Sequence, residues 1–181
     1  ARNRVKDWRS INDFGIRWRN YDLIRINEIT AFDCLPHDLL LAKLAAYGIQ
    51  DETLQLLSSY LKNRQQSVKV KGIRGLLKLI RSGVPQGSIL GPILFNIFIN
   101  DLLLLIKSDL HNFADDNTIS DVHTTLSELI KNLKEKADTA IEWFETNQMI
   151  VNPEKFKAIL VTKISQDTSN ITINLKNYNI R

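Results

Sequence analysis

Residues 82–101 read Ser82-Gly-Val-Pro-Gln-Gly-Ser-Ile-Leu-Gly-Pro-Ile-Leu-Phe-Asn-Ile-Phe-Ile-Asn-Asp101. Glycine, proline and glutamine near the start of this stretch are typical of a turn, and the apolar residues after them are typical of a buried helix. Pro92 suits the first turn of that helix, where its missing backbone N–H leaves no bond unmade. Phe113-Ala-Asp-Asp116 follows a few residues later. The order therefore predicts a turn, a buried helix and then a pair of adjacent acids in a second turn.

The composition limits the classes of protein to which the chain can belong. It has 181 residues, with 24 Lys and Arg against 20 Asp and Glu, and a pI of about 9.2. This length predicts one domain or a piece of a larger one. The mildly basic balance permits nucleic-acid binding without requiring it. The single cysteine, Cys34, excludes an internal disulfide and a zinc cluster of several cysteines.

No segment of the sequence predicts secretion or membrane insertion. Residues 1–20 are polar and basic, so we expect no secretory leader. The longest apolar stretch, residues 89–106, is interrupted by glycine, proline, asparagine and aspartate, and it predicts a buried helix rather than a membrane span. We therefore expect a soluble, intracellular protein.

Hydrophobic periodicity and turn residues predict the remaining elements. We expect strands at residues 23–26, 66–71, 76–80, 110–114, 117–122 and 156–162, and helices at residues 37–47, from Asp51 to residue 61, and from residue 125 to about residue 144. Asp51 is the expected N-cap of the second helix, and Thr125 with Glu128 forms a capping box for the third. This order of elements predicts an α+β fold, with helices packed on one face of an antiparallel sheet.

Together, residues 82–101 and Phe113-Ala-Asp-Asp116 resemble the reverse transcriptases of non-long-terminal-repeat (LINE- and jockey-like) retrotransposons. The stretch Ala31-Phe-Asp-Cys-Leu-Pro-His37 also resembles this family, and the resemblance runs from about residue 31 to about residue 162. It implies a polymerase palm-like antiparallel sheet, with the fingers mostly absent and the thumb absent. The implied division is a degenerate remnant of the fingers and lead-in strand at 1–26, a palm-like domain at 27–164 and a polar tail at 165–181.

The resemblance also implies a metal site at the acidic turn. Nucleotidyl transfer uses two divalent ions, and Mg²⁺, or Mn²⁺ in its place, takes oxygen ligands. Asp115 and Asp116 are the implied catalytic ligands. The family places a further Asp at the start of Asp-x-x-x-Ala-Phe-Asp, where this sequence has Asn27. Asn27 is therefore a degenerate ligand position with one negative charge fewer, and we predict impaired catalysis.

Three further residues and a lysine receive roles from the resemblance. Phe32 would select deoxynucleotides by crowding a ribose 2′-hydroxyl, although a phenylalanine here could equally be a core residue. Gln86 and Gly87 would contact template or nucleotide, where the alternative is an ordinary turn. Lys155 is a candidate proton donor to the leaving pyrophosphate, and the alternative is a solvated side chain. We interpret His37 and His123 as structural.

An acid-free basic segment precedes the turn at residue 82. From Lys62 to Arg81 the chain has seven basic residues and no acid, which predicts a surface that follows phosphates unless it is only a solvated hairpin. The seven candidate nucleic-acid-binding residues are Lys62, Arg64, Lys69, Lys71, Arg74, Lys78 and Arg81.

We therefore expect a fragment of a reverse transcriptase domain, whose family activity is RNA-templated DNA synthesis. Its expected ligands are an RNA template, a DNA primer, deoxynucleoside triphosphates and Mg²⁺, and the family implies action in the nucleus. Two alternatives remain: a non-catalytic nucleic-acid-binding remnant, and a transposon-derived product without function.

Overall fold

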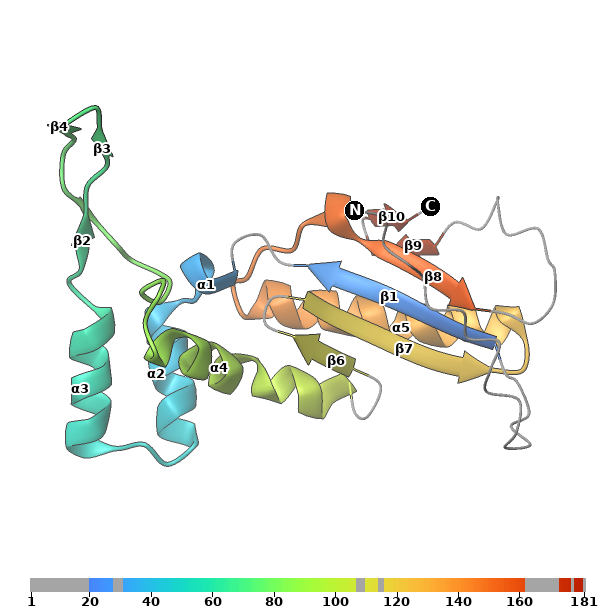
Figure 1. The fold of residues 1–181 in the computed structure, drawn as a ribbon. Coiled ribbons are helices and arrows are strands. Elements are labelled where there is room, and N and C mark those ends of the chain that lie inside the picture. The colour runs from blue at the N-terminus through green and yellow to red at the C-terminus, as the bar shows by residue number, and fades with distance from the viewer. Residues whose placement is uncertain are drawn as a thin grey trace, which may run out of the picture.

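A four-stranded antiparallel sheet forms the centre of the fold (Figure 1). The computed structural model describes residues 20–27, 31–106, 110–113, 116–161, 173–176 and 178–180. The strand order is β6-β7-β1-β8, formed respectively by Leu110–Phe113, Asp116–His123, Asn20–Asn27 and Lys157–Val161. The helix α5 lies against this sheet and contacts β1 and β7. The α+β class expected from the sequence is confirmed.

The helix α5 (Leu126–Thr146) begins at the predicted N-cap. The Thr125 hydroxyl oxygen accepts a hydrogen bond from the backbone N–H of Glu128 at 3.4 Å, and the hydroxyl donates to the Glu128 carboxylate at 2.9 Å. Glu128 therefore closes the cap through the hydroxyl rather than through the backbone N–H of Thr125. Five apolar residues along one face of α5 are buried, as the spacing predicts; they are Leu129, Leu133, Ala137, Ile141 and Phe144.

The predicted buried helix is α4 (Leu90–Ile106), and it forms the middle of the hydrophobic core. Phe95, Phe98 and Leu102 have no exposed surface. The helix contacts α2 (His37–Ala46) on one side and α5 on the other. Aromatic side chains join these layers, since the Phe98 and Trp143 rings meet edge to face at 6.0 Å between their centroids.

The strand β1 is longer and more central than the sequence predicts. Periodicity indicates a short strand at residues 23–26, but the backbone is extended over Asn20–Asn27 and pairs with β7 and β8 on its two sides. Polar residues at both ends of β1 weaken the apolar signal. Pairing on both sides supplies hydrogen bonds that do not depend on side-chain type.

Helix α2 packs antiparallel to the helix that follows it in the chain. Helix α2 ends before Gly48, which has φ of +91° and makes the predicted stop. Helix α3 spans Asp51–Leu61, and its N-cap is Gln50, which makes no side-chain capping bond. The prediction of Asp51 as the N-cap is wrong, because Asp51 is already the first helical residue. Of the residues of α3, only Leu61 is fully buried.

A β-ribbon extends from the end of α3 and returns to residue 82 (Figure 1). It consists of four two-residue strands: β2 (Gln65–Gln66), β3 (Lys69–Val70), β4 (Ile73–Arg74) and β5 (Lys78–Leu79). The sequence predicts two longer strands here. All eight strand residues are exposed, so no core face supports a regular ladder, and an unsupported two-stranded ribbon is only marginally ordered.

A half-buried ion pair between Lys43 and Asp101 links α2 to α4. The Lys43 ammonium donates to both carboxylate oxygens of Asp101, at 2.9 and 2.8 Å, and to the Phe98 carbonyl at 2.9 Å. It also lies 4.2 Å from the centre of the Phe98 ring and 4.6 Å from that of Trp143. Desolvation by burial lowers the pKa of Lys43, while the bond to Asp101 opposes that shift. Asp101, the acid at the end of residues 82–101, therefore has a structural role.

We expect Asp101→Asn to destabilise the fold because it leaves the Lys43 ammonium without its counter-ion. The Lys43 side chain is 13% exposed and that of Asp101 is 44% exposed. Losing a partner from a fully buried pair costs about 3–5 kcal/mol, and the partial exposure reduces the expected loss to roughly 1–2 kcal/mol. Urea denaturation measures it. Asp38→Asn is the control, because Asp38 pairs with Lys62 in full exposure, and a loss as large in that variant would contradict the account.

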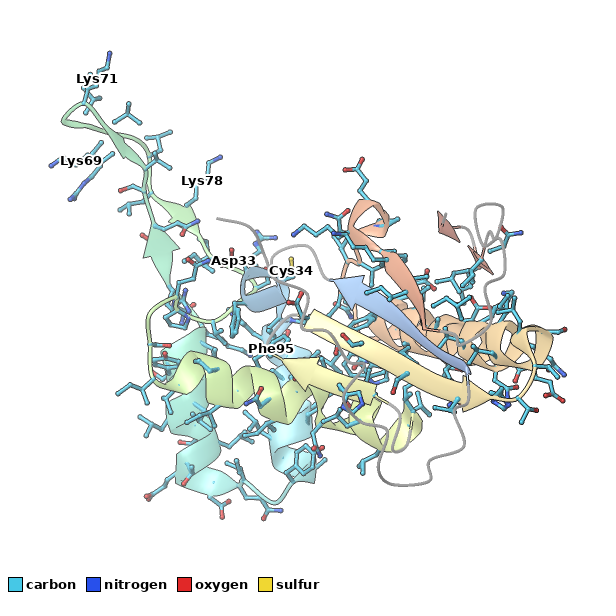
Figure 2. All side chains as sticks on the ribbon, turned by 45° about the vertical axis from the view of Figure 1, so that its right-hand side comes forward. Asp33, Cys34, Lys69, Lys71, Lys78 and Phe95 are labelled. Atoms are coloured by element: carbon cyan, nitrogen blue, oxygen red, sulfur yellow. The ribbon has the colours of Figure 1, made fainter. Side chains whose placement is uncertain are left out.

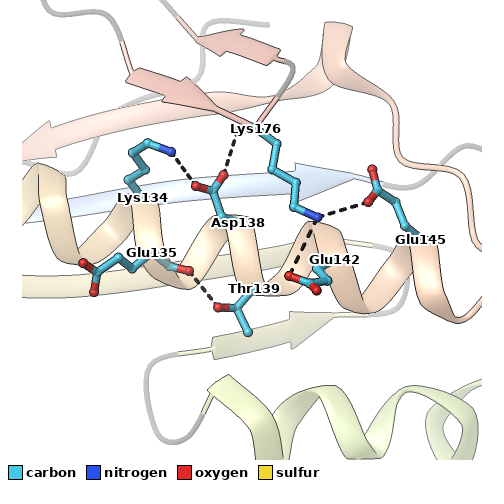
Figure 3. Close-up of polar contacts among 7 residues, drawn as sticks. All are labelled: Lys134, Glu135, Asp138, Thr139, Glu142, Glu145 and Lys176. Atoms are coloured by element: carbon cyan, nitrogen blue, oxygen red, sulfur yellow. Dashed lines mark hydrogen bonds and ion pairs between the residues drawn. The ribbon is translucent and has the colours of Figure 1, made fainter.

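The described residues near the C-terminus pack on α5, although the sequence predicts a polar tail from residue 165. Ile173 and Leu175 of β9 (Ile173–Leu175) are buried in the core, and β9 pairs with β10 (Tyr178–Ile180). Lys176 follows β9 (Figure 3). Its backbone N–H donates to Asp138 at 2.8 Å, and its ammonium lies 3.1 Å from a Glu145 carboxylate oxygen.

None of the helices in the part of the chain that the structure describes is both long enough and apolar enough to cross a membrane.

Candidate active site

The end of the sheet brings two of the predicted metal positions together. The register of β1 and β7 sets Asn27 directly opposite Asp116. Directly opposed residues in an antiparallel pair have Cα atoms about 4.5–5.5 Å apart. Phe113 of β6 is the other cross-strand neighbour of Asp116. Asp115 lies outside the described residues. The predicted hairpin of residues 110–122 is confirmed by β6 and β7, but the prediction that Asp116 lies in the turn is wrong, because Asp116 is the first paired residue of β7.

Lys155 belongs to the same end of the sheet. It closes the short 3-10 helix η3 (Pro153–Lys155), which contacts β1 and leads into β8. The β1–β8 register ends at Arg25 opposite Lys157, so Lys155 precedes the paired region on the side where Asn27 lies. Its side chain is exposed. Its role as a proton donor stays a prediction.

A short helix next to the sheet end is joined to the turn that begins at Ser82. This helix, α1 (Ala31–Cys34), follows Asn27 by three residues, so the Cα atoms of Asn27 and Ala31 are at most about 14 Å apart. The backbone N–H of Gly83 donates to Leu35 and that of Val84 donates to Phe32, both at 2.8 Å. These bonds hold the two motifs side by side.

Gly83 is the closest point of this junction. Its φ is +81°, which favours glycine, and an added Cβ would lie 2.6–2.8 Å from the Asp33 backbone. The Gly83 carbonyl accepts a hydrogen bond of 2.8 Å from the buried His37 ring. Because that acceptor is a carbonyl, Nε2 of His37 carries the proton. The structural interpretation of His37 agrees with this bond.

Phe32 rests on the core below the junction. Its ring is half-buried and lies 4.9 Å from the Phe95 ring, measured between centroids. Phe95 is completely buried in α4. Phe32 is therefore both a packing residue and a partly exposed one, so the two interpretations left open by the sequence are compatible.

Asp33 has a contact that sequence reasoning missed. The Gln86 side-chain amide donates to both Asp33 carboxylate oxygens at 3.0 Å, and the Ser82 hydroxyl donates to the Asp33 carbonyl at 3.0 Å. No local pattern could reveal the contact, since 53 residues separate Asp33 from Gln86. Figure 2 shows Asp33 and Cys34 at α1, between the ribbon and the sheet.

The space beside the Gly87 backbone is open. Its φ is +77°, and an added Cβ would meet nothing within 4 Å. A ligand can therefore approach the backbone next to Gln86. Whether nucleotide or template does so stays a prediction.

The predicted nucleic-acid-binding residues lie along the β-ribbon and its base. Lys69, Lys71 and Lys78 project from different sides of the ribbon (Figure 2). Lys62, at the base, is paired with Asp38 at 2.8 Å. Arg64 and Arg81 line a cavity between the ribbon base and α1. The structure thus separates a lysine-rich arm from an arginine-lined base.

Comparison with known proteins decides the family. The family model for reverse transcriptase (RNA-dependent DNA polymerase) matches residues 23–175. The chain belongs to the reverse transcriptase family. The resemblance found in the sequence is confirmed, and the matched residues include the sheet, the α1 junction and the ribbon.

The curated relatives to which this chain is similar are retrotransposon enzymes. The RNA-directed DNA polymerase from mobile element jockey of Drosophila funebris is 32% identical over 152 residues, which are 80% of this chain and 16% of that relative. The Pol polyprotein from the type-1 retrotransposable element R2 of Popillia japonica is 25% identical over 163 residues, 83% of this chain and 26% of the relative. The chain thus spans about a sixth to a quarter of these relatives.

Solved telomerase structures share the fold. Apo telomerase from Candida tropicalis, truncated from the C-terminal domain, matches with a TM-score of 0.59 and 18% identity, over 90% of this chain and 34% of that one. Telomerase from Candida albicans in complex with a TWJ fragment of telomeric RNA matches with a TM-score of 0.58 and 17% identity, over 90% and 30% of the two chains. At these identities the likeness shows the fold alone.

The described residues do not supply enough metal-ligating side chains for a two-metal site. Reverse transcriptases use divalent metal ions, which call for converging carboxylates. Within the described ranges no group of three or more His, Cys, Asp or Glu side chains could hold a metal ion. At the sheet end the register places the neutral Asn27 opposite the acidic Asp116. The described residues therefore do not complete the site.

Proposed function

We propose that this chain is the palm part of an enzyme that adds deoxynucleotides to a primer on an RNA template, and that Asn27 impairs this reaction. The observation that carries the proposal is the register of Asn27 opposite Asp116, four positions before α1, which is bonded to the turn at residues 82–86. This arrangement supports the proposal because it pairs two of the proposed metal positions at the end of the sheet that leads to Phe32 and its neighbours.

Asp115, Asp116 and the amide oxygen of Asn27 are the residues that we propose for divalent ions, Mg²⁺ or Mn²⁺. Such ions, when bound, would activate the primer hydroxyl and neutralise charge on the leaving group. Asn27 offers an oxygen without a charge. The site then carries one negative charge fewer against two dications, and the attraction between the site and the ions is correspondingly weaker.

The remaining residues would position the reactants. Phe32, whose partly exposed ring packs on Phe95, would crowd a ribose 2′-hydroxyl and so select deoxynucleotides. Gln86 is oriented by Asp33, which leaves its amide oxygen for a template or nucleotide donor. The open backbone at Gly87 permits close approach. Lys155 would donate a proton to the leaving pyrophosphate.

Primer extension on an RNA template tests this function. We expect the chain as given to extend a DNA primer far more slowly than its Asn27→Asp variant, with deoxynucleoside triphosphates and Mg²⁺. Action in the nucleus stays a prediction from the family.

A second candidate function is nucleic-acid binding without catalysis, and the β-ribbon favours it. Lys69, Lys71, Arg74 and Lys78 are exposed on the ribbon. None of these four has an ion pair with a described acid, and the segment from Lys62 to Arg81 contains no acid of its own. Such a surface attracts phosphates through charge and counter-ion release.

We expect the four-fold variant with Lys69, Lys71, Arg74 and Lys78 changed to Gln to lose salt-dependent binding. The slope of log affinity against log salt should fall by about 3 for a single-stranded oligonucleotide, because each neutralised phosphate contributes about 0.7. Fluorescence anisotropy at several salt concentrations measures the slope. A control variant with Lys131, Lys134 and Lys157 changed to Gln removes three charges from other elements. A loss of slope there that is equal per removed charge would rule out the ribbon as the binding surface.

A further inference from the structure

A polar cavity of about 540 Å³ lies where the β-ribbon meets α1. Its walls come from three segments: Asp33 of α1, Arg64 and Gln66 at the start of the ribbon, and residues 80–84 with Gln86 at its return. Two of the lining residues are arginines, Arg64 and Arg81. A concave site with a few converging polar groups is the usual form of a ligand site.

The ribbon register fixes the two arginines at this place. Gln65 pairs with Leu79, and the backbone N–H of Ile80 donates to the Arg64 carbonyl at 2.8 Å. Arg64 is thus held against the segment that continues into Arg81. On the other side, a bridge between Pro36 and Ser82 fixes the end of that segment against α2. Both guanidinium groups are therefore carried by backbone that is bonded on both sides.

One guanidinium nitrogen of Arg64 is buried and has no hydrogen-bond partner among the described residues. A buried donor without an acceptor costs free energy, and more so when it is charged. No described carboxylate forms an ion pair with either Arg64 or Arg81, although Asp33 lines the same cavity. This nitrogen is enclosed by protein, so a ligand that brings acceptor oxygens would satisfy it as the Arg64 side chain turns toward the cavity.

Asp33 is the acid of the lining, and its carboxylate is already engaged. Both of its oxygens accept from the neutral amide of Gln86 at 3.0 Å. Its charge opposes anion binding and lowers the affinity expected from two arginines. The lining nevertheless carries two guanidinium groups against one carboxylate, so the net charge of the cavity favours an anion.

We propose that this cavity binds a phosphate group, with Arg64 and Arg81 as its donors. The planar guanidinium fork matches phosphate oxygens two at a time. The volume exceeds that of one phosphate and leaves room for an attached sugar. The phosphate can come from a nucleic-acid strand guided by the ribbon lysines or from a nucleoside triphosphate beside Gln86. This inference rests on the proposed function for the source of the phosphate only.

Nuclear magnetic resonance of the arginine side-chain N–H groups in the whole 181-residue chain tests the proposal. Three probes are titrated separately without metal: inorganic phosphate, tetrathymidylate and thymidine triphosphate. We expect all three to shift the Arg64 signal, and the tighter of the last two identifies the source. Arg64→Gln should weaken binding of that probe about tenfold or more, because it removes a charge-assisted bond. Arg64→Lys should restore only part, since it keeps the charge without the fork.

Lys131→Gln, on α5, is the matched control because it removes the same charge outside both the cavity and the ribbon. Equal weakening by Lys131→Gln and Arg64→Gln, or an Arg64 signal that no probe shifts, would overturn the proposal. If circular dichroism shows that Arg64→Gln does not fold, Arg81→Gln takes its place with the same expected loss. Extension by the Asn27→Asp chain without a shift at Arg64 would refute the phosphate site and leave the polymerase function standing. A shift at Arg64 without extension by a folded Asn27→Asp chain would refute the polymerase function and leave the phosphate site standing.

Discussion

Replacing Gly83 by alanine should unfold or severely loosen the junction between α1 and the Ser82–Gln86 turn. The added methyl group would lie 2.6 Å from the Asp33 carbonyl oxygen and 2.7 Å from its Cα, at a residue whose φ is +81°. These neighbours are backbone atoms, which cannot rotate away as a flexible side chain would.

The expected loss of stability has two parts. A left-handed φ costs a residue with a Cβ about 1–2 kcal/mol, and overpacking costs about 1–3 kcal/mol more. We therefore expect Gly83→Ala to lower the unfolding free energy by about 2–5 kcal/mol. Relieving the clash would move Gly83 away from Asp33 and break the hydrogen bonds that join Gly83 to Leu35 and His37. The contact of Gln86 with Asp33 should then be lost as well.

Gly48→Ala is the matched control for this variant. Gly48 has φ of +91°, but an added Cβ there meets nothing within 4 Å. It should lose only the first part, about 1–2 kcal/mol. Chemical denaturation of both variants measures the difference. Equal losses would mean that the close approach of Gly83 to Asp33 does not support the fold.

Local signals in the sequence predicted the elements that depend on neighbouring residues. The helix at residues 37–47 and the strands at residues 110–122 are marked by periodicity and by turn residues. Thr125 and Glu128 predicted the start of α5. Each of these signals acts within one or two turns of the chain, so a single sequence contains it.

Contacts between segments that are distant in the chain could not be predicted from the sequence. The hydrogen bonds from Gln86 to Asp33 join residues that are far apart in the chain. The full length of β1 depends on its pairing with β7 and β8. In both cases tertiary contacts decide the outcome, and local propensity carries no record of them.

The candidate site could be predicted only in part, for the same reason. The motif around Phe32 and the turn at Gln86 were each visible in the sequence, but not the backbone bonds that join them. The arginines at the ribbon base were grouped with the ribbon lysines by charge alone. Their separation into an arm and a cavity follows from the register of β2 and β5, which charge counting cannot supply.

Asn27→Asp should raise the rate of primer extension on an RNA template by on the order of a hundredfold or more. A metal ion contributes several kcal/mol of charge stabilisation in the transition state, and about 1.4 kcal/mol corresponds to tenfold in rate. The substitution restores one carboxylate opposite Asp116 in the register of β1 and β7. Aspartate and asparagine have nearly the same shape, so the fold should change little.

The second substitution Asp116→Asn, made in the Asn27→Asp chain, is the control for this gain. It removes a carboxylate from the opposite strand and should abolish most of the restored activity. Circular dichroism of each variant verifies that a loss of rate is not a loss of fold.

The most direct test of a palm disabled at one metal position is primer extension by the chain as given and by Asn27→Asp, side by side, on the same RNA template. We predict slow or absent extension by the first and clear, Mg²⁺-dependent extension by the second. Equal rates for the two chains, or no extension by a folded Asn27→Asp chain, would contradict the account.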